Sequence, residues 1–569
     1  MSNNQAYLSS GYDDEKNLGG HIEEKDSASY QYGVEEVGAP VAAQEEETHR
    51  SLKPRQISMI AIGGAIGTGL LIGSGPSLNQ SGPGSLFIAY CIMGAVCFCV
   101  LMSLGEMSAA FPSKRGFPGF ATRTIDPAFG FATALVYLCK YLILSPNQIV
   151  AGALVIRFWN DKINSAAWVT ILIAFVVAMN FLGIKWFGEV EFWLSFIKIL
   201  TLSGLIILGL VIDLGGGPNH DRIGFRYWKD GKAFVSYPKN AGPGGAAGRF
   251  LGVVKALVGA LFAYMGTELI GVTVGEAKNP RKTVPAAIKK TFYRILFFYI
   301  ILILLTGMVV DGQGQLLKTA TSGNNKTTAS ASPFVVAIQE AGIKGLPGLV
   351  NACLLIFTFS AANSDQYIAS RTLYGMAKDG NAPRIFTYCN SRGVPMVSFA
   401  FTGMFMLLAY ICSSADGLSV WSYFTSAVTI CGALSWISIL SSHLAMMRGL
   451  KAQGISRDSL PYKSPFQPYA AIFALFITVL IAIFKGFDAF IGPTFKYKDF
   501  ICHYIAVPVY VFGFLIYKFV RKTKFVKPHE MDLHTGAREF QGLDEDDEDE
   551  MRYKSMSFKD KVIYQLKNW

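Results

Sequence analysis

Residues 61 to 75 read AIGGAIGTGLLIGSG, an apolar run in which six of the fifteen residues are glycine. Such a run is typical of a membrane span, although glycine weakens a helix. One interpretation is close packing, because Gly63 with Gly67 and Gly69 with Gly73 form GxxxG pairs that let two helices approach. The other is a break in the helix, which the bilayer tolerates only where the freed backbone groups meet protein or ligand. This stretch alone leaves both interpretations open.

A second apolar segment carries the same kind of interruption. Residues 261 to 276 read LFAYMGTELIGVTVGE, with Gly266, Thr267 and Glu268 in the middle. Transporters built from inverted repeats carry broken helices at matching positions in their two halves, so we expect unwound backbone at 67–69 and at 266–268. A carboxylate at membrane depth costs free energy unless it is paired, hydrated or protonated, which makes Glu268 a candidate for function. The alternative for Glu268 is a structural hydrogen bond to the broken backbone.

The composition indicates a protein that crosses a membrane many times. Of the 569 residues, 51% are hydrophobic and 16% are charged, and the hydrophobic residues form long blocks. A hydrocarbon core about 30 Å thick needs about 20 apolar residues per helix, and by that criterion the chain has about twelve spans. We place them near residues 57–78, 84–110, 128–158, 167–183, 190–213, 251–275, 292–311, 345–375, 397–413, 419–447, 468–488 and 500–520. The predicted class is therefore an all-α integral membrane protein.

Polar segments flank these spans. Residues 1–50 are too polar to bury a core, so we expect a disordered tail there, followed by a membrane domain over 51–520. Residues 521–569, with the acidic run GLDEDDEDEM, are expected to form a second, solvated tail. An even number of spans places both tails on one side, and the loops predicted on that side are richer in Lys and Arg than the short loops opposite. The positive-inside rule then predicts that both termini are cytoplasmic, and the net charge of +11 suits an anionic leaflet rather than nucleic acid.

Signatures of soluble enzymes are missing from the sequence. It has no GxxxxGK phosphate loop and no HExxH, and its seven histidines lack metal-binding spacing. Most of the nine cysteines lie in apolar spans, where cysteine usually packs as a small hydrophobic residue. We therefore expect no enzymatic activity, no metal and no cofactor.

Seven motifs run through most of the membrane domain: ISMIAIGGAIGTGLLIGSG, SLGEMSAAFP, GEVEFWLSFIKI, GGGPNHDRIGFRYW, GTELIGVTVGEAKNPRKTVPAAI, SAANSDQYIASRTLYGMAKDG and PYKSPFQPY. They resemble the motifs of the fungal amino acid permeases, within the amino acid/polyamine/organocation superfamily. The stretches KYLILSPNQIVAGALVI, SPFVVAI and KGFDAFI look most similar to the dicarboxylic amino acid permeases, which import glutamate and aspartate. The resemblance implies a LeuT-like fold with a 5+5 inverted repeat, in which helices 1 and 6 are broken and two further helices lie outside.

The resemblance also implies a substrate site at the two breaks. Backbone N–H groups of the first break would bind the α-carboxylate, and glycine is needed there because a side chain would block the approach. Unpaired carbonyl groups at the second break would bind the α-ammonium, and Phe262 or Tyr264 would cover the substrate as an aromatic gate. The implied residues are Ile66, Gly67, Thr68 and Gly69 at the first break, and Phe262, Ala263 and Tyr264 at the second.

Energy coupling is expected to use protons. Lys198 lies at hydrocarbon depth in FWLSFIKILTL, and in proton-coupled relatives a lysine at this place stands where sodium would bind, near a hydroxyl that Ser360 would supply. A buried lysine can lose its proton near neutral pH, whereas the alternative for Lys198 is a side chain that reaches the membrane interface. Glu106 lies nearer a cytoplasmic end and is a candidate for proton transfer or for pairing with a basic loop. Glu268 is the other candidate for proton transfer.

Two residues of the third helix bear on the side chain of the substrate. Many of these permeases carry a glutamate at the position that Asn147 occupies here. A carboxylate facing the pocket would repel an anionic substrate by several kcal/mol at about 4 Å, and asparagine removes that repulsion. Lys140 lies seven residues earlier, about two helical turns away on the same face, and is a candidate to attract an acidic side chain. The alternative for Lys140 is a side chain that extends toward the cytoplasmic end.

The sequence therefore predicts proton-coupled uptake of acidic amino acids across the plasma membrane. A general or neutral amino acid permease and a non-transporting amino acid sensor of the same fold stay open as alternatives. A channel is disfavoured because the spans carry isolated charges rather than a continuous polar face. Expected partners are the amino acid, the proton, the lipid bilayer and regulatory trafficking proteins at the tails.

Overall fold

The computed structural model describes residues 67–111, 115–160, 162–181, 183–238, 242–269, 280–321, 332–390, 392–414, 416–491, 494–534 and 555–557. Helices dominate these residues, and the β-pairing within them is one isolated bridge between Cys389 and Pro395. The α-helices are α2 (Thr68–Leu71), α3 (Ser74–Ser81), α4 (Pro83–Ala110), α5 (Gly116–Thr124), α6 (Pro127–Ile156), α7 (Ser165–Phe181), α8 (Ile184–Asp213), α9 (Gly245–Tyr264), α11 (Pro280–Val309), α12 (Gln315–Thr321), α13 (Pro333–Glu340), α14 (Leu346–Lys378), α15 (Met396–Met404), α16 (Gly417–Ala452), α17 (Tyr469–Phe484), α18 (Tyr497–Tyr504) and α19 (Ala506–Arg521). Short 3-10 helices include η1 (Arg226–Trp228), η5 (Phe405–Ser413), η6 (Arg457–Ser459) and η7 (Phe487–Ala489).

Many of these helices have the length and hydropathy of membrane spans. Within the described residues, nine meet both requirements, counting α15 together with η5 as one. The bent pair α18 and α19, at 44°, gives a further span, and α7 is a shorter apolar helix of 17 residues. The predicted first span at 57–78 lies mostly outside the described residues, so the total of twelve stays a prediction. The predicted class, an all-α membrane protein, is confirmed.

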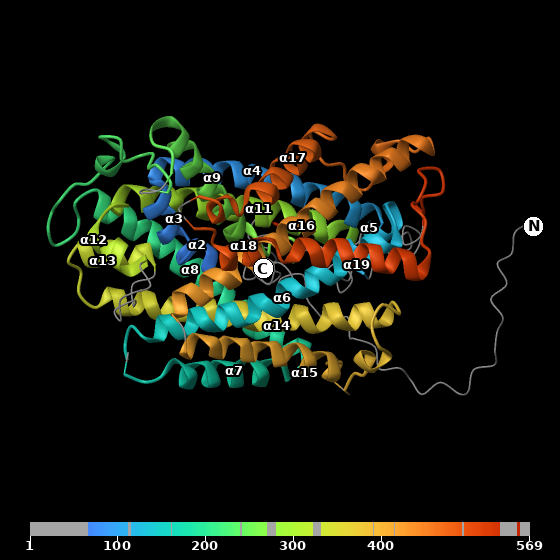
Figure 1. Cartoon of the computed structure of the whole chain (residues 1–569), viewed down its shortest axis with the longest axis horizontal. Coiled ribbons are helices and arrows are strands. Elements are labelled where there is room, and N and C mark those ends of the chain that lie inside the picture. Colours follow the sequence, from blue (N-terminus) through green and yellow to red (C-terminus); the bar gives the residue numbers. More distant parts are fainter. Residues whose placement is uncertain are drawn as a thin grey trace, which may run out of the picture. The chain divides into compact units, whose positions relative to one another are not determined.

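Helix α6 lies at the centre of the packing. Its start follows from the sequence, because the side chain of Asp126 accepts a hydrogen bond from the N–H of Ala128 at 2.7 Å and Pro127 occupies the first helical position. The helix packs against α14, α16, α19 and α7. Figure 1 shows α6, α14, α15 and α7 running side by side. Most of α6 is buried, so its polar side chains face other helices rather than lipid.

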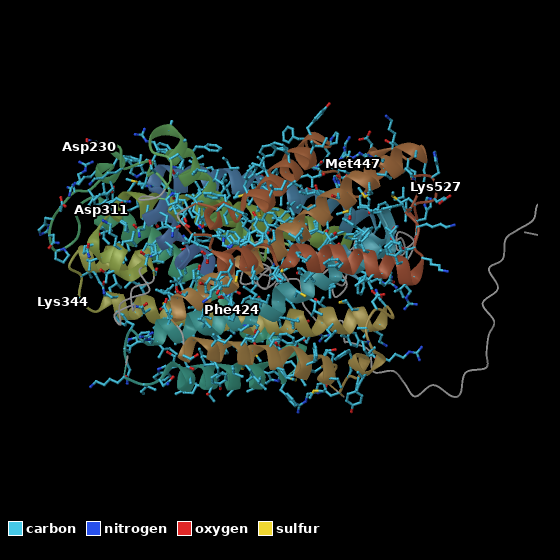
Figure 2. The ribbon with its side chains drawn as sticks, in the orientation of Figure 1. Asp230, Asp311, Lys344, Phe424, Met447 and Lys527 are labelled. Atoms are coloured by element: carbon cyan, nitrogen blue, oxygen red, sulfur yellow. The ribbon has the colours of Figure 1, made fainter. Side chains whose placement is uncertain are left out.

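The connecting segments gather at opposite ends of the helices. At one end lie α12, α13 and the loop that contains η1, and at the other lie α5 and the chain that follows α19 (Figure 1). Figure 2 labels Asp230, Asp311 and Lys344 at the first end and Lys527 at the second. The two ends of the membrane region therefore carry different sets of loops.

Helix α9 ends at Tyr264, in the middle of an apolar segment. Met265 has an extended backbone, with φ −67° and ψ 150°, and Gly266 has φ 97°, a value that glycine adopts readily and other residues do not. Residues 265–268 form turns, and the N–H of Gly266 donates to Oε2 of Glu268 at 3.0 Å. The break predicted at 266–268 is therefore present.

The first interrupted segment differs in detail from the prediction. Gly67 has an extended backbone, but Thr68 and Gly69 already belong to the four-residue helix α2, which ends before α3 begins at Ser74. The reason is packing, because a Cβ atom at Gly69 would lie 2.7 Å from Cα of Ala263. Glycine at this position permits two backbones to touch, which is the packing interpretation of the glycine-rich stretch. Ile66 lies outside the described residues.

The predicted C-terminal tail begins as a packed segment. Residues 522–534, which we call the C-terminal strap, follow α19 and contact the ends of α5 and α16. The N–H of Val526 donates to the carbonyl of Ile125 at 2.8 Å, and Gln453 donates to the carbonyl of Met531 at 2.7 Å. Met531 and Leu533 are buried, so this part of the predicted tail is not solvated. Residues 1–66, 535–554 and 558–569 lie outside the described residues, and with them the remainder of both predicted tails.

Candidate functional site

A small cavity lies beside the two interrupted segments. It is lined by residues of α2, α6 and α14 and by the end of α9: Gly67, Thr68, Gly69, Tyr141, Leu144, Gln148, Phe262, Ala263, Met265, Gly266, Ala361 and Asp365. Its volume is about 20 Å³. A single water molecule needs about 10–15 Å³, so the structure shows a closed conformation in which this site is too small for an amino acid.

Five of the residues predicted to bind substrate line this cavity, namely Gly67, Thr68, Gly69, Phe262 and Ala263. The hydroxyl of Thr68 donates to Oε1 of Gln148 at 2.9 Å and so ties α2 to α6. The ring of Phe262 lies against Gly69 and meets Trp421 edge to face, with 6.1 Å between the ring centroids. Phe262 therefore lines the cavity, and its role as an aromatic gate stays a prediction.

Tyr264 points away from the cavity. Its hydroxyl donates to the carbonyl of Tyr90 at 3.0 Å, and its ring packs on Tyr299 with 4.7 Å between centroids. Of the two aromatic residues predicted as gates, Phe262 lines the cavity and Tyr264 does not.

The three carbonyl groups predicted to bind the α-ammonium already accept hydrogen bonds. The donors are N–H of Met265 to Phe262 at 3.3 Å, the hydroxyl of Tyr299 to Ala263 at 2.9 Å, and the hydroxyl of Thr267 to Tyr264 at 3.1 Å. A carbonyl oxygen has two lone pairs, so these groups keep the capacity for a second donor. The prediction of unpaired carbonyls is not met in this conformation.

Lys140 and Glu268 form an ion pair in the interior. Both side chains have 0% exposure, and Nζ of Lys140 donates to Oε1 of Glu268. Trp436 donates to the other carboxylate oxygen at 3.2 Å, and the ammonium lies 4.9 Å from the ring centroid of Tyr141. Lys140 therefore does not extend toward the membrane interface. Glu268 both pairs with a lysine and bonds to the broken backbone at Gly266, so it has the structural role that the sequence left as an alternative.

Asn147 contacts α16 rather than the cavity. Its side-chain amide donates to the hydroxyl of Thr425 at 3.1 Å, and it is absent from the residues that line the cavity. Its neighbour Gln148 lines the cavity instead. In this conformation Asn147 does not line the cavity, and its role in substrate selection stays a prediction.

Lys198 belongs to a second buried cluster. Its Nζ lies 3.9 Å from Oε1 of Glu191. The same oxygen accepts a hydrogen bond of 2.5 Å from the hydroxyl of Ser360. All three side chains have 0% exposure, and Lys198 lies 5.7 Å from the ring centroid of Phe357. Lys198 therefore stays in the interior and meets Ser360 through Glu191, a residue to which the sequence assigned no role.

Asp365 is the carboxylate that lines the cavity. Its side chain is 6% exposed, and among the described residues its Oδ2 has no hydrogen-bond partner. It lies within electrostatic range of Lys140, Lys198 and Glu191. The rule that singled out Glu268, a carboxylate inside an apolar span, applies equally to Asp365 in SAANSDQY and would have found it.

Two interrupted segments that meet at a buried site, with charged side chains at membrane depth, are features of a transporter. The family model described as amino acid permease matches residues 56–530. This chain belongs to the amino acid permease family. The dicarboxylic amino acid permease of Saccharomyces cerevisiae is 46% identical over 89% of this chain and 84% of its own. The lysine-specific permease of the same yeast is 38% identical over 89% of this chain and 82% of its own.

Among solved structures, the chain is similar to Mhp1, a nucleobase-cation-symport-1 family transporter in a closed conformation with bromovinylhydantoin bound. The identity is 14% and the TM-score is 0.45, over 81% of this chain and 99% of that one.

Glu106 of the permease is held away from the cavity, near the strap end of the helices. Its carboxylate accepts hydrogen bonds from Arg457 at 2.9 and 3.0 Å, from the N–H of Ser464 at 3.2 Å and from the hydroxyl of Ser464, and His443 lies 3.1 Å away. The side chain of Glu106 has 0% exposure. These contacts are the pairing with a basic loop that the sequence offered as one of its two interpretations.

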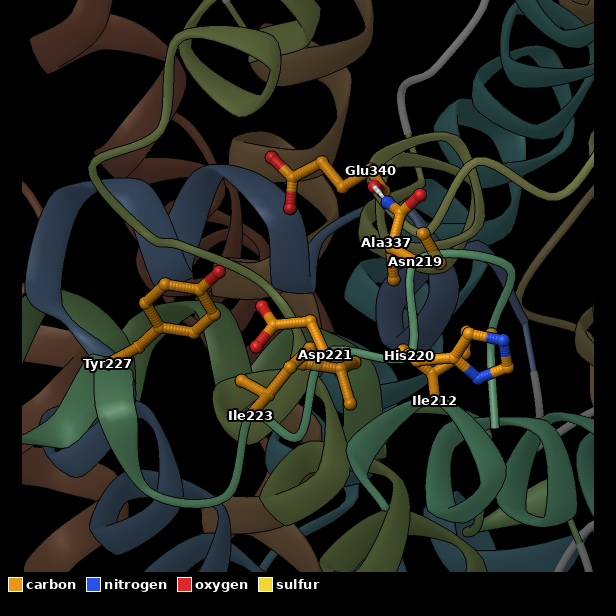
Figure 3. A pocket seen from close by; sticks show the side chains of 11 residues that line it. Ile212, Asn219, His220, Asp221, Ile223, Tyr227, Ala337 and Glu340 are labelled. Atoms are coloured by element: carbon orange, nitrogen blue, oxygen red, sulfur yellow. Dashed lines mark hydrogen bonds between the residues drawn. The ribbon is translucent and has the colours of Figure 1, made fainter. Parts of the chain in front are cut away.

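A further pocket of about 70 Å³ lies at the opposite end of the permease (Figure 3). Figure 3 shows Glu340, Asp221 and Tyr227 around it. The side-chain amide of Asn219 donates to the backbone carbonyl of Glu340 at 3.3 Å. Burial and the nearby carboxylate of Asp311 raise the pKa of Glu340 to about 7. None of the predicted substrate residues lines this pocket.

Proposed function

We propose that this permease imports glutamate and aspartate together with protons across the plasma membrane, with both termini in the cytoplasm. The observation that carries the proposal is the cavity beside the two breaks, which holds one carboxylate, Asp365, within electrostatic range of two buried lysines. The relative that is 46% identical is named for dicarboxylic amino acids, which supports an acidic substrate. The excess of Lys and Arg in the loops at the strap end supports the orientation.

The substrate backbone binds between the interrupted segments. The first N–H groups of a helix have no intrahelical partner, so the backbone from Gly67 to Gly69 offers donors to the α-carboxylate. The α-ammonium meets the carbonyl groups of Phe262 and Ala263, each of which has a lone pair to spare. Because the cavity is small in the closed conformation, the two segments must separate to admit an amino acid and close again behind it.

The charges around the cavity explain why an acidic substrate would travel with a proton. Lys140 is neutralised by Glu268, and Lys198 lies beside Glu191, so Asp365 is left as the surplus negative charge of the five. Two negative charges about 4 Å apart repel by about 4 kcal/mol at an effective dielectric of about 20. An anionic side chain therefore binds well only after Asp365 has taken up a proton, which it gives back to the opposite side once the substrate has left.

In this scheme Lys140 attracts the side-chain carboxylate of the substrate once the site has opened and the substrate shares the ammonium with Glu268. Lys140 does not line the closed cavity, but its neighbour Tyr141 does. Gly266 also lines the cavity, and its N–H donates to Glu268, the ion-pair partner of Lys140. Lys198 occupies the place of a coupling cation and holds Glu191 and Ser360 in position. Sodium would need a cage of oxygen ligands, which a fixed ammonium in the same place opposes.

Uptake by the purified permease in proteoliposomes tests the proposal. We expect radiolabelled glutamate to accumulate when the outside is more acidic, without sodium, and to leak out when a protonophore is added. Unlabelled aspartate should compete, whereas leucine and lysine should compete weakly. Equal competition by leucine and lysine would leave only a general amino acid permease, an alternative that the 38% identical lysine-specific relative keeps open. Binding without accumulation would indicate a sensor, and uptake that needs sodium would contradict proton coupling.

Two variants test the residues that couple transport to protons. Lys198→Ala should abolish accumulation and spare exchange of internal for external glutamate. Asp365→Asn should keep exchange but remove its dependence on external pH, because the surplus charge is gone at every pH. Asp213→Asn is the matched control, since Asp213 is also 6% exposed but lies at the end of α8, outside the cavity lining. An unchanged pH profile in Asp365→Asn would contradict the scheme.

A further inference from the structure

A third cavity lies under the C-terminal strap, near the last turns of α16. Its volume is about 430 Å³, within the range of about 300–1,000 Å³ that is typical of ligand pockets. The walls are mostly apolar and include Leu444 and Ala445 of α16, Leu475 of α17, and Phe525 and Met531 of the strap. Arg448, one turn after Leu444, is the residue of the lining that carries a charge. The pocket thus combines a mostly apolar lining with a single cationic side chain.

The cavity is bordered by helices that face lipid. On α17, Ile472 and Phe476 flank Leu475 and are 51% and 62% exposed. Near the end of α19, Phe519 is 76% exposed, and Phe525 in the strap is 61% exposed. We expect the exposed apolar side chains of α17 and α19 to face acyl chains, which would place the cavity beside the bilayer.

The strap and the end of α19 are strongly basic. Residues 518–534 contain two acidic residues, Glu530 and Asp532, and five basic ones: Lys518, Arg521, Lys522, Lys524 and Lys527. Lys518 pairs with Asp126 and lies 3.8 Å from the ring centroid of Phe525, which fixes the aromatic wall of the cavity. A cluster of four to eight Lys and Arg immediately after a membrane helix is a pattern that binds anionic lipid.

From this juxtaposition we propose that the cavity between α16, α17 and the strap binds an anionic phospholipid, with one acyl chain among Leu444, Ala445 and Leu475 and the phosphate at Arg448. A free phosphate ion would leave the apolar walls in contact with water, and a zwitterionic lipid would bring no net charge to the basic strap. The lipid belongs to the cytoplasmic leaflet, and this choice of leaflet alone rests on the proposed function's orientation. Bound lipid joins the strap to α16 and α17.

Thermal unfolding of the full-length protein in detergent tests the site without reference to transport. The delipidated protein is titrated with mixed micelles that contain phosphatidylserine, phosphatidylcholine or no lipid, and with inorganic phosphate in plain detergent. We expect phosphatidylserine to raise the unfolding midpoint in a saturable manner, with much smaller effects of phosphatidylcholine and inorganic phosphate. Equal effects of the two lipids, an equal effect of inorganic phosphate, or no effect of any lipid would overturn the proposal.

Paired variants separate a specific site from general charge attraction. Arg448→Gln should weaken the apparent affinity for phosphatidylserine about tenfold, because a charge-assisted contact is lost, whereas Lys451→Gln on the same helix, outside the cavity lining, should not. Ala445→Trp should fill the cavity and remove the retained lipid seen by native mass spectrometry, whereas Ile472→Trp on the outer face of α17 should keep it. If Lys451→Gln reduces the affinity as much as Arg448→Gln, the attraction is diffuse and the site is refuted. Because these measurements need no substrate, their failure is distinct from a failure of the transport proposal.

Discussion

Removing one partner of the buried ion pair between Lys140 and Glu268 should destabilise the permease much more than removing both. Removing one partner of a buried pair leaves an uncompensated charge and costs about 3–5 kcal/mol. We expect the upper part of this range for Lys140→Met, because the carboxylate it leaves behind has 0% exposure. At about 2 °C per kcal/mol for a large chain, the unfolding midpoint should fall by about 8–10 °C. Removing both charges in Lys140→Met/Glu268→Gln should restore much of this loss, because no unpaired charge then stays buried.

The assay is a double-mutant cycle on unfolding midpoints in detergent, with glutamate uptake measured in parallel. Lys255→Met is the matched control, because Lys255 pairs with Asp488 but the two side chains are 20% and 11% exposed, so its loss should be smaller. We also expect the double variant to be stable but inactive, since Lys140 is proposed to attract the substrate. Single losses that simply add in the double variant would refute the interpretation of the pair as one energetic unit.

Three further outcomes are expected. Gly69→Ala should lower the initial rate of glutamate uptake about tenfold, since overpacking costs about 1–3 kcal/mol and the new Cβ would lie 2.7 Å from Ala263. Gly204→Ala on α8, where a new Cβ would meet nothing within 4 Å, should keep its rate, and equal rates in the two variants would contradict this. The folded protein keeps the proton on Glu340 up to about pH 7 while the unfolded chain releases it near 4.5, so stability should fall as pH rises through this window, and Glu340→Gln should flatten that slope in unfolding midpoints. Met531→Ala, in the buried part of the strap, should cost about 2–5 kcal/mol in the same measurement, and no loss would mean that the strap is not packed in solution.

The class of the protein and the second break could be predicted because both depend on local composition. Long apolar blocks are typical of membrane spans, and an interruption inside one block that matches an interruption in the other half of the chain predicts a broken helix. The structure places Gly266 at φ 97° and bonds its N–H to Glu268, as that argument requires. The first break was less predictable, because glycine serves both unwinding and packing, and Gly69 serves packing.

The partners of the charged residues could not be predicted, because they lie on other helices. Lys140 and Glu268 are separated by 128 residues, and Asn147 and Thr425 by 278. Sequence spacing predicts which residues share a face of one helix, but not which helix that face meets. For the same reason Lys140 and Lys198 each kept an alternative of reaching the interface, which their 0% exposure removes.

The packing of the strap could not be predicted from a composition averaged over the whole tail. The acidic run at 542–551 dominates residues 521–569 and suggests a solvated segment. Met531 and Leu533 lie in that region, and both are buried against the membrane domain. A cluster of basic residues directly after a membrane helix was the available signal.

The anchoring of the strap at Asp126 also sets an order of events during synthesis. Asp126 caps α6, the central helix, and its fully buried carboxylate is bound by Lys518 and by the hydroxyl of Thr523 at 2.7 Å. The first of these partners follows it by 392 residues. Ribosomes add about 5–20 residues per second, so this carboxylate waits roughly 20–80 s for its permanent partners. During that interval the start of α6 lacks these two partners, and a segment made late in synthesis completes a helix that was made early.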